Sequence, residues 1–204
     1  MGHIRSYIEG LQKTLDQLPE DRIHQVIEIL HTARLERRQV FIMGNGGSAS
    51  TASHFACDLG KNTRSAAVPN FKVIALTDNM AIFSALANDE GYESVFAQQL
   101  ISFVQPGDIV IGISASGKSP NVLRAIEAAN QSGAITVGFT GFDGGRLGDM
   151  AQIHIHVPSN SIEQVEDIHL ALEHMISQAL REQVYAEAVA IDPALVKEMT
   201  RWDC

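Results

Sequence analysis

The sequence predicts an α/β protein, a parallel sheet covered by helices on both faces in a three-layer arrangement. Short apolar runs alternate along the chain with segments of helical spacing. The runs are apolar throughout instead of alternating with polar residues, which is typical of strands buried on both faces. With 204 residues, 45% of them hydrophobic and 19% charged, the chain fits one core. We therefore expect a single domain over residues 1–204.

The expected elements follow in order along the chain. Apolar residues recur at helical spacing over 4–18 and 23–30 with Pro19 between them, so two helices within about residues 1–37 precede any strand. The apolar runs predict five strands, at 40–43, 72–76, 108–113, 135–139 and 153–157. Helical segments follow the first three strands, at about 48–59, 80–88 and 122–129. A long helix over 162–185 closes the domain, and the segment 186–204 has no clear period and is expected to be a helical tail.

Composition excludes several classes of function. The net charge of −9, with no basic run, argues against binding to nucleic acid, which requires clustered Lys and Arg. No apolar stretch approaches the roughly 20 residues that cross a bilayer, so we expect no membrane association. Two cysteines are too few for a disulfide framework, and we expect Cys57 to be a small buried group. These features together predict a cytoplasmic protein.

The loop after the first strand, Gly44-Asn45-Gly46-Gly47-Ser48-Ala49, matches the dinucleotide pattern G-x-G-x-x-A. The acidic residue that would bind the ribose should lie about 20 residues further on, whereas the next strand ends far beyond that, at Asp78. A structural turn is the other alternative. We favour a nest of backbone N–H groups that, with the Ser48 hydroxyl, binds a phosphate or sugar hydroxyls.

The loop after the third strand satisfies G-x-x-x-x-G-K-S over 112–119, the pattern of a nucleotide phosphate loop. Gly112 lies inside the strand, however, and Pro120 follows at once. We therefore interpret the loop as a phosphate cradle built from the hydroxyls of Ser114, Ser116 and Ser119. Pro120 would begin the helix whose positive end faces the same anion.

A series of motifs, in their order along the chain, resembles the sugar isomerase (SIS) domain family. The motifs are Asn45-Gly46-Gly47-Ser48, His54-Phe55-Ala56, Asn88-Asp89, 113–119, 140–145 and Ile168-His169. The resemblance runs from about residue 4 to 182. It implies a five-stranded flavodoxin-like parallel sheet and a homotetramer with active sites shared between subunits. It also implies an aldose–ketose isomerase acting on sedoheptulose 7-phosphate, or on a related phosphosugar. Some relatives instead act as partner-binding regulators, for example of a replication initiator.

The same resemblance implies which residues contact the phosphosugar. They are Asn45, Gly46, Gly47, Ser48, Asn88, Asp89, Ser114, Ala115, Ser116 and Ser119. The cations nearest the loops are Lys61, Arg64 and Lys118, and the sequence leaves open which of them meets the phosphate.

Two helices carry candidate groups for acid, base and metal chemistry. His54 and Asp58 are four residues apart and point the same way, and a solvated polar pair is the alternative. Glu166 and His174 lie eight apart on the closing helix, about 80° around its axis, with His169 as a competing residue.

The family pattern implies that His54, Asp58, Glu166 and His174 together hold zinc or another divalent metal. The family has Glu where this chain has Asp58 and Gln where it has Glu166, and both replacements keep oxygen ligands. For the isomerisation we expect Asp58 or Glu166 as the base and His174 as the acid.

Overall fold

The computed structural model describes residues 2–195 and contains one five-stranded sheet. All strands are parallel, in the order β2-β1-β3-β4-β5. Their bounds are β1 Gln39–Gly44, β2 Lys72–Ala75, β3 Ile109–Ile113, β4 Ile135–Thr140 and β5 Ile153–His156. The register pairs Val40 with Ile109 and Ile109 with Ile135, so the carboxyl ends of the three central strands meet at one edge. The predicted α/β class and flavodoxin-like sheet are confirmed.

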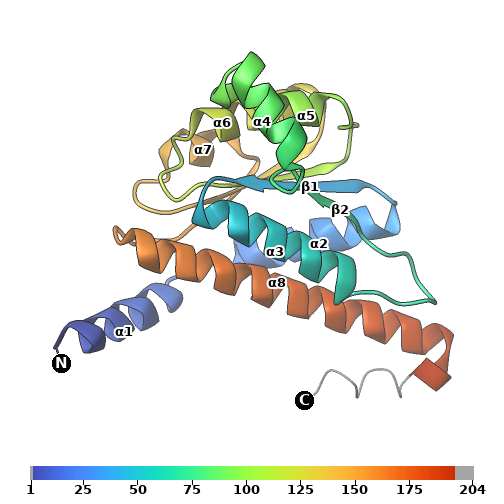
Figure 1. The fold of residues 1–204 in the computed structure, drawn as a ribbon. Helices are drawn as coiled ribbons and strands as arrows, with labels where there is room; N and C mark the ends of the chain where they lie inside the picture. The colour runs from blue at the N-terminus through green and yellow to red at the C-terminus, as the bar shows by residue number, and fades with distance from the viewer. Residues whose placement is uncertain (1, 196–204) are drawn as a thin grey trace.

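Helices cover both faces of the sheet (Figure 1). On one face lie α2 Glu20–Leu35, α3 Gly47–Lys61 and α8 Ile162–Ile191, and α1 Gly2–Leu15 contacts α8. On the other lie α4 Met80–Asp89, α5 Ala97–Ile101, α6 Pro120–Gln131 and α7 Gly145–Met150. Short 3₁₀ helices occupy Tyr92–Ser94 (η1) and Pro193–Leu195 (η2). No helix in the described part of the chain is long and apolar enough to cross a membrane.

Each face of the sheet has its own hydrophobic core. Alternate residues of β1 divide between them, because Val40 and Ile42 belong to the α2–α3–α8 side whereas Phe41 and Met43 belong to the α4–α7 side. β3 is buried at every position, as its uninterrupted apolar sequence predicts. β2 is half-exposed because it lies at the sheet edge.

The structure adds elements that the sequence did not predict. The segments η1, α5 and α7 are three to six residues long, too short to show a helical period. The helix α8 also continues past residue 185 to Ile191. Buried Arg34 explains this continuation, because it donates hydrogen bonds to Glu187 of α8 and to the Pro69 carbonyl. The remainder of the expected tail, residues 196–204, lies outside the described residues.

Candidate functional site

The loop after β1 lies where the sequence placed it and is joined to α6. Gly46, at φ +55°, reverses the chain before α3 begins at Gly47. The side-chain amides of Asn45 and Asn121 exchange hydrogen bonds of 2.8 and 2.9 Å. The Tyr92 hydroxyl donates a further 2.9 Å hydrogen bond to Asn45 Oδ1. Asn45 is therefore held from two sides, and buried Ser48 lies in the first turn of α3.

The loop after β3 brings the predicted hydroxyls together at the start of α6. Ser114 Oγ and Ser119 Oγ lie 3.1 Å apart, and Ser116 Oγ accepts a hydrogen bond from the Lys118 amide. Ser119 is the N-cap of α6, but its side chain makes no capping bond. Pro120 occupies the first turn as predicted. The Ser119 hydroxyl and the positive end of a twelve-residue helix thus point to one place.

A cavity of ≈ 520 Å³ lies between these two loops. Its lining combines Asn45 and Ser119 with residues that the sequence did not single out: Tyr92, Glu93, Pro120, Asn121 and Arg124. Arg124 supplies a cation, although it also lies 3.3 Å from Glu93. The pairing of β1 with β3 brings Asn121 and Arg124 beside Asn45, and no local sequence pattern indicates such a pairing.

Other residues predicted at this site lie outside the cavity. Asn88 and Asp89 are exposed at the end of α4, where Asn88 Nδ2 donates to Asp89 Oδ1. Lys118 Nζ forms a 2.8 Å ion pair with Asp143, and this lysine holds the pKa of the Asp143 carboxyl below its usual range. In this conformation Lys118 is therefore engaged by a neighbouring loop.

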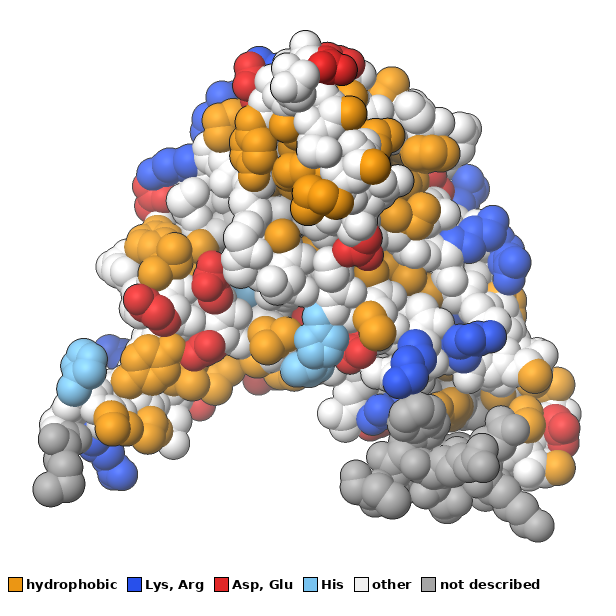
Figure 2. All heavy atoms as spheres, viewed as in Figure 1, with side chains coloured by type: hydrophobic (Ala, Val, Ile, Leu, Met, Phe, Trp, Pro, Cys, Tyr) orange, Lys and Arg blue, Asp and Glu red, His pale blue; other side chains and the backbone are white. Residues whose placement is uncertain are grey.

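A second group of chemical residues lies where α3 and α8 run side by side. One ligand atom from each of His54, Asp58, Glu173 and His174 lies within 4.8 Å of the others. His54 Nε2 is 3.7 Å from Asp58 Oδ1, and the rings of His54 and His174 meet edge to face with centroids 4.9 Å apart. Figure 2 shows histidine side chains at the surface in this region. We call these four residues the α3–α8 cluster.

Exposure differs sharply within the α3–α8 cluster. The side chains of His54 and His174 are 45% and 50% exposed, that of Asp58 is 15% exposed, and that of Glu173 is fully buried. Burial, and to a lesser degree the charge of Asp58, raises the pKa of Glu173 to about 8. The charge of Asp58 disfavours a second negative charge on Glu173, so the cluster suits a positively charged ligand.

Three of the four predicted metal ligands are brought together, and Glu166 is not among them. The carboxylate of Glu166 lies against Gly47, since a Cβ placed on Gly47 would be 2.6 Å from both Glu166 oxygens. It therefore occupies the N-terminus of α3, where the helix dipole favours an anion. His169, the competing residue, is buried against Phe139 and away from the cluster.

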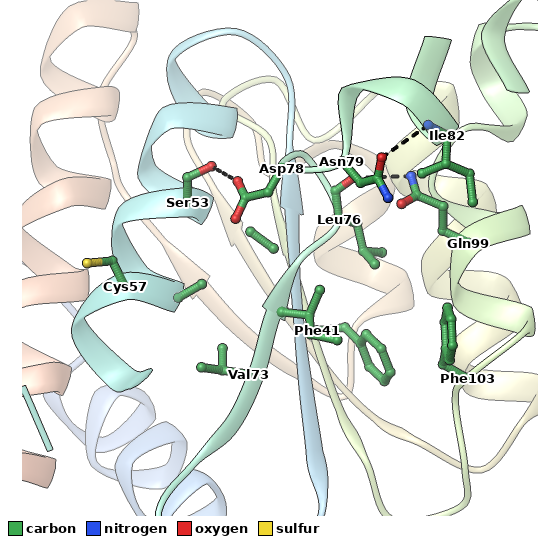
Figure 3. Close-up of a pocket in the computed structure, with 13 residues that line it drawn as sticks. Phe41, Ser53, Cys57, Val73, Leu76, Asp78, Asn79, Ile82, Gln99 and Phe103 are labelled. Atoms are coloured by element: carbon green, nitrogen blue, oxygen red, sulfur yellow. Dashed lines mark hydrogen bonds between the residues drawn. The ribbon is translucent and has the colours of Figure 1, made fainter. Parts of the chain in front are cut away.

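Another cavity, ≈ 530 Å³, lies elsewhere, beside the edge strand β2 (Figure 3). Its walls are mostly apolar and include Phe41, Val73 and Phe103, so it offers little to a phosphosugar. Ser53 donates a hydrogen bond to Asp78 at its rim. Cys57 also lines it and is exposed. The prediction that Cys57 is buried is therefore wrong, because α3 turns this position away from α8.

The molecule is thus an α/β/α sandwich with hydroxyl-rich loops at the carboxyl ends of its parallel strands, the edge at which open sheets of this class bind ligands. A family model described as "SIS domain" matches residues 5–141. The phosphoheptose isomerase of Geotalea daltonii is 33% identical over 194 residues, covering 90% of this chain and 97% of that protein. The phosphoheptose isomerase of Aquifex aeolicus is 36% identical over 168 residues, covering 82% and 87%.

A solved structure agrees with these relatives. The phosphoheptose isomerase from Neisseria gonorrhoeae superimposes with a TM-score of 0.81 at 28% identity, covering 89% of this chain and 96% of that chain. The chain belongs to the phosphoheptose isomerase family of SIS-domain proteins. Relatives of this similarity over most of the chain support isomerase activity.

Proposed function

We propose that this protein is an aldose–ketose isomerase that converts sedoheptulose 7-phosphate to D-glycero-D-manno-heptose 7-phosphate. The observation that carries the proposal is the α3–α8 cluster, which gathers two imidazoles and two carboxyls within 4.8 Å in a chain related to phosphoheptose isomerases. Such a group supplies both an acid and a base at one place. A scaffold without catalysis has no need to hold these side chains together.

The phosphate of the substrate would bind between the loops after β1 and β3. Ser114 and Ser119 offer hydroxyl donors there, and α6 adds the positive end of its dipole. Arg124 lies on the same cavity wall. Because the chain carries a net charge of −9, the substrate's phosphate depends on such local groups and not on the overall field.

The isomerisation moves one proton between two carbons and another between two oxygens. Asp58 would take a proton from C1 of the ketose and return it to C2 of the enediol. His174 would protonate the oxygen on C2 as the enediol forms and take up the proton of the C1 hydroxyl as the enediol collapses, leaving an aldehyde at C1. Asp58 has the shorter acidic side chain and therefore must lie closer to the carbon than a Glu would. Glu166 stays the alternative base.

The donor set of the α3–α8 cluster fits zinc or another divalent cation. Two imidazoles and two carboxylates are ligands that zinc accepts, and both oxygens of buried Glu173 make no hydrogen bond among the described residues. His54, Asp58 and His174 would hold such a cation through their side chains. When bound, the cation supplies positive charge that stabilises the developing enediolate oxygen.

We also propose a homotetramer whose active sites are shared between subunits. The phosphate-binding cavity opens toward α6, whereas the α3–α8 cluster lies between helices of the opposite face. Within one subunit the two halves of the site are therefore divided by the sheet edge. The exposed imidazoles of His54 and His174 leave room for a substrate held by a neighbouring subunit.

An NMR assay with sedoheptulose 7-phosphate and supplied zinc tests the proposed function. We expect the aldose product from the wild-type chain, none from His174→Gln, and continued turnover with His169→Gln, because His169 lies outside the cluster. No product from a folded, zinc-supplied wild-type chain would contradict the isomerase and favour a partner-binding regulator. Hydrolysis of ATP by the same sample would instead favour the nucleotide phosphate loop.

A further inference from the structure

We propose that Glu173 is the fourth ligand of the cation site in the α3–α8 cluster and that Glu166 stands outside it. The inference rests on the proposed function only for the presence of a divalent cation. It assigns a ligand that the sequence did not suggest, and it makes all four ligands side chains of one subunit: His54, Asp58, Glu173 and His174.

The burial of Glu173 is the first step. Its side chain has no exposed surface, and neither carboxylate oxygen has a hydrogen-bond partner among the described residues. The nearby imidazole of His174 has its Nε2 3.5 Å from Glu173 Oε2. Removing a carboxyl from water without a partner is costly, and such groups are normally paired or bound to a metal. A cation among the cluster atoms would satisfy both oxygens.

The position of Glu173 along α8 is the second step. The helices α3 and α8 run parallel, because Glu166 meets Gly47 near their starts and the Tyr185 hydroxyl donates to the Asn62 carbonyl near the end of α3. His54 therefore lies level with the middle of this contact, where Glu173 and His174 are. Glu166 comes seven residues earlier, which is two turns and about 10 Å along the axis.

Glu166 also has other surroundings. Its oxygens lie so close to Gly47 that a side chain there would collide with them. The first turn of α3 faces this carboxylate and favours its negative charge. Moving Glu166 to the α3–α8 cluster would require giving up this position. The structure thus separates two carboxyls that share nearly one face of α8, one at the start of α3 and one at the cluster.

Zinc binding to the full chain, stripped with a chelator, tests the assignment. Calorimetric titration with zinc should give an affinity about tenfold or more weaker for Glu173→Gln than for wild type. Glu166→Gln is the matched control, with the same chemical change on the same helix face, and should stay within about threefold. Equal losses, a larger loss with Glu166→Gln, or no zinc binding by the wild-type chain would overturn the assignment.

Two further measurements distinguish a lost zinc ligand from a variant that has merely folded incorrectly. Zinc should raise the melting temperature of wild type and Glu166→Gln more than that of Glu173→Gln, since at one zinc concentration the stabilisation increases with the affinity. Cobalt(II) absorption should change with Glu173→Asp, which keeps the carboxylate but shortens it, and stay unchanged with Glu166→Gln. An unchanged cobalt spectrum and zinc affinity in Glu173→Asp and Glu173→Gln would contradict the proposal.

Activity separates this inference from the proposed function. Turnover of sedoheptulose 7-phosphate by a wild-type chain whose zinc affinity is insensitive to Glu173 would overturn the ligand assignment alone. Loss of zinc with Glu173→Gln in a chain that shows no turnover would overturn the isomerase and support the ligand assignment.

Discussion

Three polar side chains at successive turns of α8 are buried without a hydrogen-bond partner among the described residues: His169, Glu173 and Ser177. Each such group opposes folding by an amount on the order of 1–3 kcal/mol. Glu173 has cluster partners through which a cation would offset this cost, whereas His169 packs against Phe139 in the apolar core. The two residues therefore predict different behaviour with pH.

His169 should make the protein less stable as the solution becomes acidic. Burial lowers the pKa of His169 to about 4, an effect that the nearby Thr140 backbone offsets only in part. The unfolded chain therefore binds a proton at His169 near pH 6.5, whereas the native state binds it only near pH 4. The free energy of unfolding therefore falls as the pH drops from about 6.5 toward 4. We expect this residue to account for about 2–3 kcal/mol lost between pH 7 and 4.5.

Urea unfolding of wild type and His169→Leu at both pH values measures this contribution. The loss on acidification should be smaller in His169→Leu by the stated amount, because the variant has no imidazole to protonate. Parallel losses in the two proteins would show that His169 is not the responsible group. The difference between proteins cancels the carboxyl groups that titrate in both.

For single residues, the sequence predicted those site groups that lie at helical spacing on one helix. His54 and Asp58 were predicted together from their four-residue spacing, and the structure places both with His174. No pattern in the sequence indicated Glu173, because its burial depends on the position of α8 along the axis of α3. Helical spacing fixes the direction of a side chain around one axis but not its level against a second helix.

Among the elements, two strand-end loops support each other. Gly117 accepts a hydrogen bond from the Leu147 amide, and the Gly141 amide donates to the Ala115 carbonyl, at 2.9 and 2.8 Å. Gly117 has φ +62°, and a Cβ there would lie 2.0 Å from the Gly144 carbonyl oxygen. The serine loop is therefore shaped by a loop from the next strand, with no room for a side chain at the contact.

Gly117→Ala should destabilise the loop after β3, which we propose binds the phosphate, by more than the cost of its backbone conformation alone. A positive φ costs an alanine about 1 kcal/mol, and the collision with Gly144 adds to it, so we expect a loss above about 2 kcal/mol. We also expect a raised KM for the phosphosugar. Chemical denaturation and steady-state kinetics measure the two effects.

Gly133→Ala is the matched control for that substitution. Gly133 also has a positive φ, +75°, but its nearest neighbour would be 3.4 Å from a Cβ. It should therefore lose only about 1 kcal/mol and keep its KM. Equal losses in the two variants would show that the contact between loops contributes nothing.

Elements were predictable in proportion to their length and burial. All five strands were predicted from their apolar runs, and β1 and β3 are buried at nearly every position, whereas the edge strand β2 is half-exposed. The end of α8 was not predicted, since its continuation depends on a hydrogen bond between Arg34 and Glu187, which are 153 positions apart in the sequence. Contacts at that separation leave no local pattern.

At the scale of the whole molecule, one exposed apolar surface lies on α1. Ile4 and Ile8 on this helix are exposed, and α1 extends away from the sheet along the start of α8 (Figures 1 and 2). An apolar helix that covers so little of its own core is typical of a subunit contact. The surface is consistent with the proposed homotetramer, in which one subunit's serine loop would meet another's α3–α8 cluster.

Mixing two inactive variants tests whether active sites are shared. His174→Gln removes the proposed acid, and Ser119→Asp keeps the N-cap of α6 while its charge repels the phosphate. Each homogeneous protein should be inactive. If every site takes its loop from one subunit and its cluster from another, random assembly of equal amounts leaves about one quarter of the sites intact. We therefore expect about a quarter of wild-type activity from co-expressed, differently tagged chains.

The matched control places both substitutions on one chain and mixes it equally with wild type. Shared sites then again leave about a quarter of full activity, whereas sites confined to one subunit leave about half. Both mixtures are assayed on oligomers purified through both tags, because oligomers built from a single kind of chain would also give no activity in the first mixture and half in the second. In these mixed oligomers, no activity in the first mixture and half in the second would place each complete site within a single chain.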